Sequence, residues 1–205
     1  GENLTHGARV VHTVGSECAI GKKTMALELD LEARRRGLAS VFVPTGQTGI
    51  AIAGWGIAVD AVIADFLAGA GERLVVEGAK RGDLLWVEGQ GAVCHPLYSG
   101  VTLGLLHGCA PHALVLCHKA GATEIEGCHG HPIPPLPELV ALYEAVSLPA
   151  RRARVVAIAL NTAGLGEGEA RAAAARVEAE TGLTADDPVR FGAAALLDAV
   201  LVSLR

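Results

Sequence analysis

The segment Val14–Thr24, VGSECAIGKKT, follows a short β-rich apolar run, Ala8–Val14, and precedes a helical pattern. A strand, a glycine-rich loop and a helix form the arrangement of a phosphate-binding loop, whose usual form is G-x-x-x-x-G-K-[ST]. Two details differ here. Five residues separate Gly15 from Gly21, and Lys23 stands where a hydroxyl residue is expected. The segment is therefore either a working nucleotide site or a strand-to-helix turn that contains glycines.

The physical requirements of such a loop favour the working site. Small residues let backbone N–H groups converge on a phosphate, and a helix that starts at once directs its dipole at the anion. Lys22 follows its glycine directly and can reach the outer phosphates, while Thr24 offers a hydroxyl one position late. We therefore predict that a nucleotide or another phosphate binds at Gly15, Ser16, Glu17, Cys18, Ala19, Ile20, Gly21, Lys22, Lys23, Thr24 and Met25.

The composition of the 205-residue chain limits the class of protein, and the length suits one domain over residues 1–205. Hydrophobic residues make up 51% and aromatic residues 3%, so Ala, Val and Leu must fill the core, and a buried dimer interface is compatible with this content. The net charge of -5 argues against a nucleic-acid partner. No apolar run approaches the roughly 18 residues of a membrane helix. Five scattered cysteines without a CxxC pair favour a reducing, cytoplasmic compartment.

Short apolar runs alternate with helical patterns along the chain. The runs expected to be strands cover residues 8–14, 40–44, 84–88, 113–118, 154–160 and 188–191. The helical patterns cover residues 22–36, 60–81 (as one helix, or as two broken near 69–71), 137–146, 167–181 and 192 onward. Apolar strands between helices indicate a mostly parallel sheet covered on both faces, so we predict a three-layer α/β fold of the P-loop NTPase type. Such sheets bind ligands at the carboxyl ends of their strands, where the unusual polar stretches of this chain lie.

Acidic and amide residues follow several of the expected strands. Glu88 ends the apolar run in LLWVEGQG, where P-loop proteins hold magnesium or its water, although a strand-ending surface glutamate is the alternative. Asp60 follows the second strand and is either a metal ligand or a charge favoured by a helix dipole. With Thr24, these two residues form the predicted metal set. Asn161 follows the fifth strand and is either a base-recognising amide or a turn residue.

Histidines and cysteines suggest two further sites that we do not favour. The cluster Cys128, His129 and His131 lacks the second pair of ligands that zinc sites usually show. Cys18 lies just before a helix N-terminus and near two lysines, a setting that lowers a thiol pKa and creates a nucleophile. The alternative, which we favour, is that Cys18 is a small apolar loop residue.

Four segments together resemble one bacterial and archaeal family: VGSECAIGKKTMALEL, FVPTGQTGIAIAGWGIAVDAVIADFLAGA, WVEGQGAVCHPLYSGVTLGLLHG and PHALVLCHKAG. That family was catalogued as a P-loop domain of unknown function and is tied to D-glutamate N-acetyltransferases of D-amino-acid catabolism. Its members usually carry a further N-terminal α/β domain, so this chain is expected to correspond to their C-terminal part. Lys23 departs from the family pattern, where an apolar residue is expected.

The resemblance implies transfer of an acetyl group from acetyl-CoA to the amine of D-glutamate or a similar small acidic amino acid. The loop would then hold the phosphates of CoA or of a regulatory nucleotide. Glu88 or His95 is the candidate general base, with Lys22 as the third catalytic candidate. Gln47, Thr48, Tyr98 and Ser99 would bind the substrate.

Two other functions stay open. The loop spacing also resembles that of dethiobiotin synthetase and the cobyrinate amidases, and the G-K-x-T ending that of adenylate kinases. The residues alone therefore fit an ATP- and Mg²⁺-dependent kinase or carboxylate-activating ligase, in which Lys22 stabilises the γ-phosphoryl charge and Glu88 holds magnesium. The third reading is a non-catalytic nucleotide-binding module.

Overall fold

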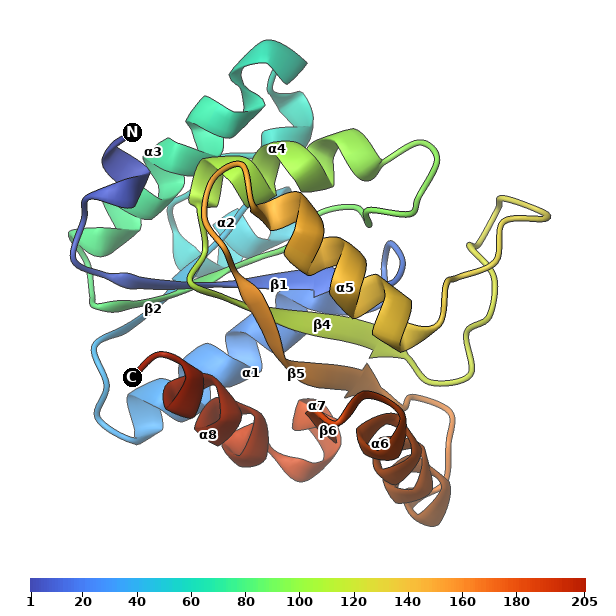
Figure 1. Cartoon of the computed structure of the whole chain (residues 1–205). Helices are drawn as coiled ribbons and strands as arrows, with labels where there is room; N and C mark the ends of the chain where they lie inside the picture. Colours follow the sequence, from blue (N-terminus) through green and yellow to red (C-terminus); the bar gives the residue numbers. More distant parts are fainter.

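The central feature of the fold is a sheet of six strands (Figure 1). The computed structural model describes all 205 residues of the chain. The strands lie in the order β2-β3-β1-β4-β5-β6, and every neighbouring pair is parallel. This arrangement confirms the predicted three-layer parallel α/β fold. The strands are β1 Arg9–Gly15, β2 Ser40–Val43, β3 Leu84–Val87, β4 Ala113–Lys119, β5 Arg154–Asn161 and β6 Thr184–Asp186.

Helices cover both faces of the sheet. In Figure 1, α1, α7 and α8 lie below it, whereas α3, α4 and α5 lie above it. α2 follows β2, and α6 contacts α5 and β6. None of these helices has both the length and the apolar character needed to cross a bilayer. The helices are α1 Lys22–Arg35, α2 Gln47–Ala53, α3 Leu67–Ala79, α4 Ser99–Cys109, α5 Leu136–Ser147, α6 Glu167–Thr181, α7 Pro188–Phe191 and α8 Ala194–Ser203, with short 3-10 turns η1 Glu2–Leu4, η2 Val59–Ala61 and η3 Ala64–Phe66.

The core explains why the strands read as continuous apolar runs. All residues of β2 and β3 are buried, and β1 is buried from its second residue onward, because helices pack on both faces. Trp86 of β3 and Tyr143 of α5 are the largest fully buried side chains. Tyr143 packs among residues of β1, β4 and β5, which fixes the position of its hydroxyl at the end of β1.

The prediction for residues 60–81 was wrong in one respect. The segment 59–66 forms two short 3-10 turns where a helix was expected, and α3 then runs unbroken through residues 69–71, in agreement with the unbroken alternative. Gly71 lies against the neighbouring helix α4, where an added Cβ would come within 3.2 Å of the Gly108 Cα. The glycines of α3 and α4 therefore permit a close helix–helix approach and do not end a helix.

Two other segments also differ from the prediction. The expected strand over residues 188–191 is the helix α7, because the Asp187 side chain accepts hydrogen bonds from the N–H groups of Val189 and Arg190 and Pro188 suits the first turn. The sixth strand lies earlier, at Thr184–Asp186. The polar stretch after β2 also contains a helix, α2, and the stretch after β3 leads into α4.

Candidate functional site

The loop between β1 and α1 is anchored by side chains from distant parts of the chain. The Tyr143 hydroxyl donates to the Gly15 carbonyl at 2.6 Å and accepts from the Val93 N–H at 3.0 Å. On the other side, Asn161 Nδ2 donates to the Ile20 carbonyl at 3.0 Å. The loop therefore holds its shape without a ligand, which lowers the entropic cost of binding one.

Lys22 folds back over this loop. Its Nζ donates to the Glu17 carbonyl at 2.6 Å, and only 6% of the residue is exposed. Burial lowers the pKa of Lys22, whereas the neighbouring acidic groups, which include Glu17 and Glu88, act in the opposite direction. Gly15 makes room for the side chain, because a Cβ there would lie 2.9 Å from the Lys22 Cδ. Gly21, with φ 108, lets α1 start directly at Lys22, so the first free N–H groups of the helix face the loop.

Thr13 ties the loop strand to the segment that follows β3. Its Oγ1 accepts a hydrogen bond from the Gly89 N–H at 3.0 Å. The same hydroxyl donates to the Val87 carbonyl at 3.2 Å. A Cβ at Gly89 would lie 1.8 Å from the Thr13 carbonyl oxygen, so only glycine fits. This close approach brings the carboxylate of Glu88 to the phosphate loop.

Glu88 is buried at the end of β3, with one carboxylate oxygen used and one free. Oε2 accepts from the N–H groups of Thr45 at 2.9 Å and Gly46 at 3.2 Å, whereas Oε1 has no hydrogen-bond partner. Gly49 is needed beside it, because a Cβ there would lie 2.4 Å from Oε2. Burial raises the pKa of Glu88, although these N–H groups and the nearby lysines oppose the shift. A carboxylate with a raised pKa and a free oxygen can accept a proton from a ligand.

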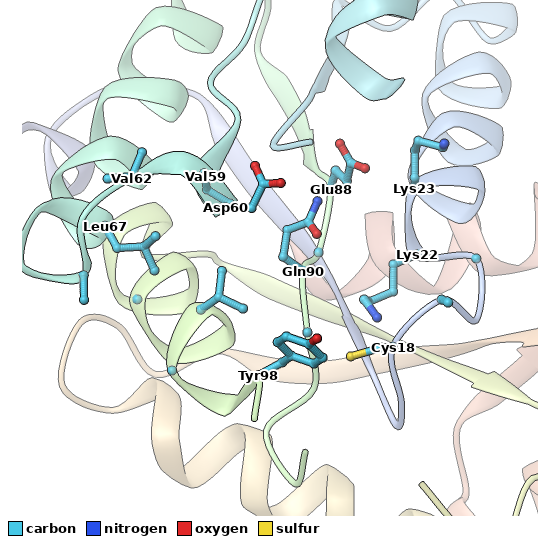
Figure 2. Close-up of a pocket in the computed structure, with 18 of the residues that line it drawn as sticks. Cys18, Lys22, Lys23, Val59, Asp60, Val62, Leu67, Glu88, Gln90 and Tyr98 are labelled. Atoms are coloured by element: carbon cyan, nitrogen blue, oxygen red, sulfur yellow. The ribbon is translucent and has the colours of Figure 1, made fainter. Parts of the chain in front are cut away.

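A cavity of about 750 Å³ joins the loop to Glu88 (Figure 2). Its volume is in the range of small-molecule sites. Figure 2 shows Cys18 and Lys22 on one side and Gln90, Asp60 and Tyr98 facing them. Apolar residues of η2, α3 and α4 form the remaining wall. The lining includes Cys18, Ala19, Gly21, Lys22, Lys23, Thr24, Asp60, Glu88 and Tyr98 among the predicted residues, and Val59, Val62, Leu67, Gln90 and Val101 among those that were not predicted.

The other predicted residues do not line this cavity. Gln47 and Thr48 are exposed in the first turn of α2, and Ser99 begins α4 outside the cavity lining. The Asn161 amide is already engaged, because its Oδ1 accepts from the Ala163 N–H at 3.0 Å and its Nδ2 holds the loop. The remaining predicted phosphate-binding residues are also absent from the lining: Gly15, Ser16, Glu17 and Ile20 of the loop, and Met25 of α1.

The predicted metal residues have side chains of the kind that magnesium prefers. Thr24, Glu88 and Asp60 all line the cavity and all offer oxygen atoms, the ligands that Mg²⁺ prefers. Such an ion would neutralise charge on bound phosphates. Lys23 supplies a fixed positive charge at the position where other phosphate loops carry a hydroxyl.

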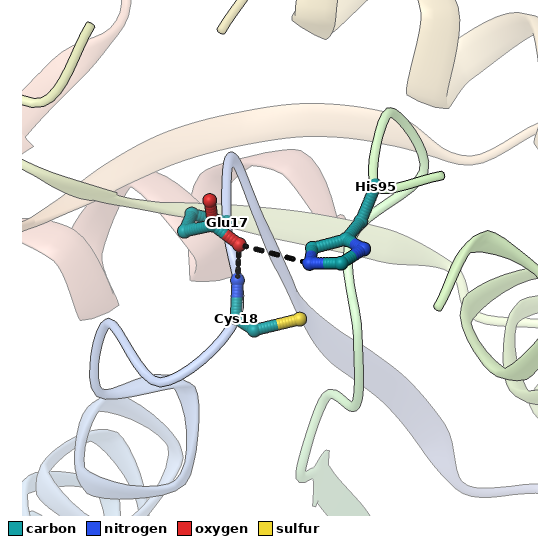
Figure 3. Close-up of side chains that lie close together, drawn as sticks. All are labelled: Glu17, Cys18 and His95. Atoms are coloured by element: carbon teal, nitrogen blue, oxygen red, sulfur yellow. Dashed lines mark hydrogen bonds and ion pairs between the residues drawn. The ribbon is translucent and has the colours of Figure 1, made fainter. Parts of the chain in front are cut away.

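A second group of polar side chains lies behind the loop: Glu17, Cys18 and His95 (Figure 3). Their donor atoms lie within 4.8 Å of one another, and the His95 Nε2 is 3.8 Å from a Glu17 oxygen. The His95 Nδ1 accepts from the Leu97 N–H at 3.1 Å, so the neutral ring carries its proton on Nε2. A histidine that binds a metal through Nε2 donates a hydrogen bond through Nδ1. In His95 the Nδ1 accepts a hydrogen bond instead, so the ring is not arranged as a metal ligand.

These contacts bear on three of the candidate roles. His95 has no free ring nitrogen that could take a proton, so the candidate role of general base belongs to Glu88 rather than to His95. Both Glu17 oxygens are occupied, one by the Cys18 N–H and one by the Glu126 N–H at 2.9 Å. Burial raises the pKa of the Cys18 thiol, which argues against the nucleophile alternative. The segment 128–131 brings no three metal-ligand atoms together.

The strand order, the loop that wraps its lysine and the carboxylate at the end of β3 define a P-loop domain. The chain belongs to the family described as "Domain of unknown function (DUF1611_C) P-loop domain", which matches residues 1–197.

Three known proteins illustrate its relationships. The chain is 46% identical over 194 residues to a protein from Tritonibacter scottomollicae named D-glutamate N-acetyltransferase, covering 91% of this chain and 56% of that protein. A crystal structure of a DUF1611 family protein from Anabaena variabilis matches 98% of this chain and 59% of that chain, with a TM-score of 0.95 and 48% identity. Cobyrinic acid a,c-diamide synthase from Mycobacterium smegmatis shares the fold, with a TM-score of 0.57 and 12% identity over 95% of this chain and 94% of that one. The chain thus spans less than two thirds of its nearer relatives.

Proposed function

We propose that this chain is the phosphate-binding part of an N-acetyltransferase that uses acetyl-CoA to acetylate D-glutamate or a similar small acidic amino acid in the cytoplasm. One observation carries the proposal: a single cavity joins the phosphate loop at Lys22 to the free carboxylate oxygen of Glu88. The relative named D-glutamate N-acetyltransferase, 46% identical to this chain, supports the choice of reaction.

The two walls of the cavity suit the two ends of the donor. Lys22 and the N-terminus of α1 would hold phosphates of CoA, because ammonium and free N–H groups favour anions. The apolar wall, with Val59, Leu67 and Val101, would contact the uncharged arm that ends in the acetyl thioester. Lys23 and Tyr98 would bind carboxylates of the acceptor.

The reaction then needs one proton acceptor. The free Oε1 of Glu88 takes a proton from the substrate ammonium, which leaves a lone pair on nitrogen. That nitrogen attacks the acetyl carbonyl, a C–N bond forms, and the C–S bond breaks as the sulfur of CoA leaves. The proton held by Glu88 passes to the departing thiolate, and the nitrogen releases its second proton to water, so the products are the N-acetyl amino acid, free CoA and one proton. The raised pKa of Glu88 suits both steps, because a base works best when its pKa lies nearer the working pH.

A second function is favoured by a different observation. Thr24, Asp60 and Glu88 each contribute an oxygen-bearing side chain to the lining of the cavity, and an ATP-dependent kinase or ligase with magnesium requires oxygen ligands. In that case Glu88 would serve the metal and not the proton, and nucleotide binding would depend on magnesium. A nucleotide-binding module without turnover would share the same binding site.

The test is a chromatographic assay of N-acetyl-amino-acid formation, with acetyl-CoA and either D-glutamate or L-glutamate, in the presence and absence of EDTA. Acetylation of D-glutamate that withstands EDTA is the expected result. Release of ADP or phosphate from ATP, only with magnesium and without acetylation, would replace this proposal by the second function.

A further inference from the structure

Gln90 is the polar side chain of the cavity lining that was not predicted from the sequence. It lies two residues after Glu88 and lines the same cavity. Its backbone is fixed, because the Thr102 hydroxyl donates to the Gln90 carbonyl at 2.9 Å. A polar side chain held in place at the wall of a binding cavity is suited to recognise part of the ligand.

The neighbouring Thr45 determines which end of the Gln90 amide faces the cavity. The Thr45 hydroxyl donates its one hydrogen to the Glu88 carbonyl at 2.8 Å. Its oxygen can therefore only accept from Gln90, whose Nε2 lies 3.1 Å away. One of the two hydrogens on the amide nitrogen is thus held by Thr45, and the Gln90 Oε1 is the acceptor atom of the amide that is left for a ligand.

The Gln90 amide and the free oxygen of Glu88 are neighbours. Both lie against Gly46, where an added Cβ would be 2.7 Å from the Gln90 Nε2 and 3.4 Å from the Glu88 Oε1. Figure 2 shows both side chains on the same wall as Asp60, across from Lys22. This corner of the cavity therefore offers two acceptors without a partner, the Glu88 Oε1 and the Gln90 Oε1, beside the second hydrogen of the Gln90 amide nitrogen, whereas Lys22 and the helix N-terminus opposite supply donors.

We infer that Glu88 and Gln90 together hold the ammonium group of the acceptor amino acid, and that Thr45 is the positioning residue that orients Gln90. An ammonium group has only donors and needs several acceptors, which this corner supplies. The inference rests on the proposed acetyl transfer. After Glu88 has taken one proton, the amide oxygen keeps its hydrogen bond to the amine without competing for a proton. Gln90 thereby holds the nucleophile in place during attack.

The test measures separate KM values for the amino acid and for acetyl-CoA in four proteins: wild type, Gln90→Leu, Thr45→Val and Thr45→Ser. Loss of a hydrogen bond to a charged group predicts that Gln90→Leu raises the KM for the amino acid about 10- to 100-fold and leaves that for acetyl-CoA unchanged. Thr45→Val should also raise the KM for the amino acid, whereas Thr45→Ser, which keeps the hydroxyl, should have the wild-type KM. Thr184→Val, on the edge strand β6, is the matched control and should change neither constant.

A further variant, Gln90→Glu, adds a second carboxylate beside Glu88. The added negative charge should favour the protonated form of the amine. The increase of kcat/KM with pH that accompanies loss of this proton should therefore shift to higher pH. An unchanged amino-acid KM in Gln90→Leu, or a rise in the KM for acetyl-CoA instead, would overturn the inference while leaving acetyl transfer intact. A requirement for magnesium that Gln90→Leu weakens would assign this corner to a hydrated cation. Absence of acetylation by the wild type would instead refute the proposed function itself.

Discussion

Two buried glutamates flank the phosphate loop, and they differ in what their carboxylates are free to do. Glu17 lies within the loop, and backbone N–H groups of Cys18 and Glu126 occupy its two oxygens. Glu88 lies at the end of β3, and both of its backbone donors, Thr45 and Gly46, share a single oxygen. The two residues have the same exposure, 5%. Burial is therefore the same for the two carboxylates, and the unoccupied oxygen of Glu88 is what distinguishes them.

The surroundings of the two carboxylates differ in the same way as their hydrogen bonds. The Glu17 carboxylate joins two segments that are 109 residues apart, and so it stabilises the loop. The Glu88 carboxylate lies beside Gly46 and Gly49, and the residue lines the cavity. We therefore expect substitution of Glu17 to alter stability first and substitution of Glu88 to alter activity first.

The largest expected effect is that of Glu88→Gln on acetyl transfer. The amide oxygen can still accept from both N–H groups, so the fold should keep its melting temperature. The proton acceptor is lost, and kcat should fall by about 10²- to 10⁴-fold. Steady-state kinetics beside a thermal melt would check this, and a variant with nearly full kcat would contradict the role of the free oxygen.

Lys22→Met tests the residue that lies between the two glutamates. The thioether keeps most of the volume but removes the charge that faces a bound phosphate. Affinity for a phosphate-bearing ligand should fall about 10- to 100-fold, because a charge-assisted hydrogen bond is lost. Calorimetric titration of the variant measures this, and Lys80→Met, at an exposed lysine paired with Glu77, is the control that should bind normally.

Glu17→Gln should have the converse effect of Glu88→Gln. A glutamine offers one oxygen where two N–H groups need acceptors, so one of them loses its partner. The free energy of unfolding should fall by roughly 1–3 kcal/mol. Chemical denaturation of the two Glu→Gln variants side by side checks the contrast. Equal stability of the two would remove the distinction between the carboxylates.

The smallest effect at neutral pH concerns His12, a buried group of β1 with no partner on either ring nitrogen. Burial, with a smaller contribution from Lys22, lowers the pKa of His12 from 6.5 to about 3. The unfolded chain therefore binds the proton first, and stability is lost as the pH falls from about 6.5 toward 3. His12→Leu should remove up to ~1.4 kcal/mol per pH unit of that dependence. Melting temperatures across this range, compared with the wild type, would show no difference if the ring were protonated in the fold.

The sequence predicted the parts of the site that depend on contiguous residues. The loop motif places Lys22 at a helix start, and the apolar run before Glu88 places its carboxylate at a strand end. Gln90 carried a weak signal, a polar residue between two glycines after that strand. The hydrogen-bond partners of Glu17 and the tautomer of His95 could not be predicted, because both depend on where backbone N–H groups lie in the folded chain. The helix α7 could have been recognised from the capping residue Asp187 followed by proline.

The measurement that tests the central claim most directly is calorimetric titration of the wild type and Lys22→Met with acetyl-CoA in the absence of magnesium. We predict saturable binding of one acetyl-CoA to the wild type and clearly weaker binding to the variant. Binding of ATP only with magnesium, and no binding of acetyl-CoA to either protein, would contradict the account.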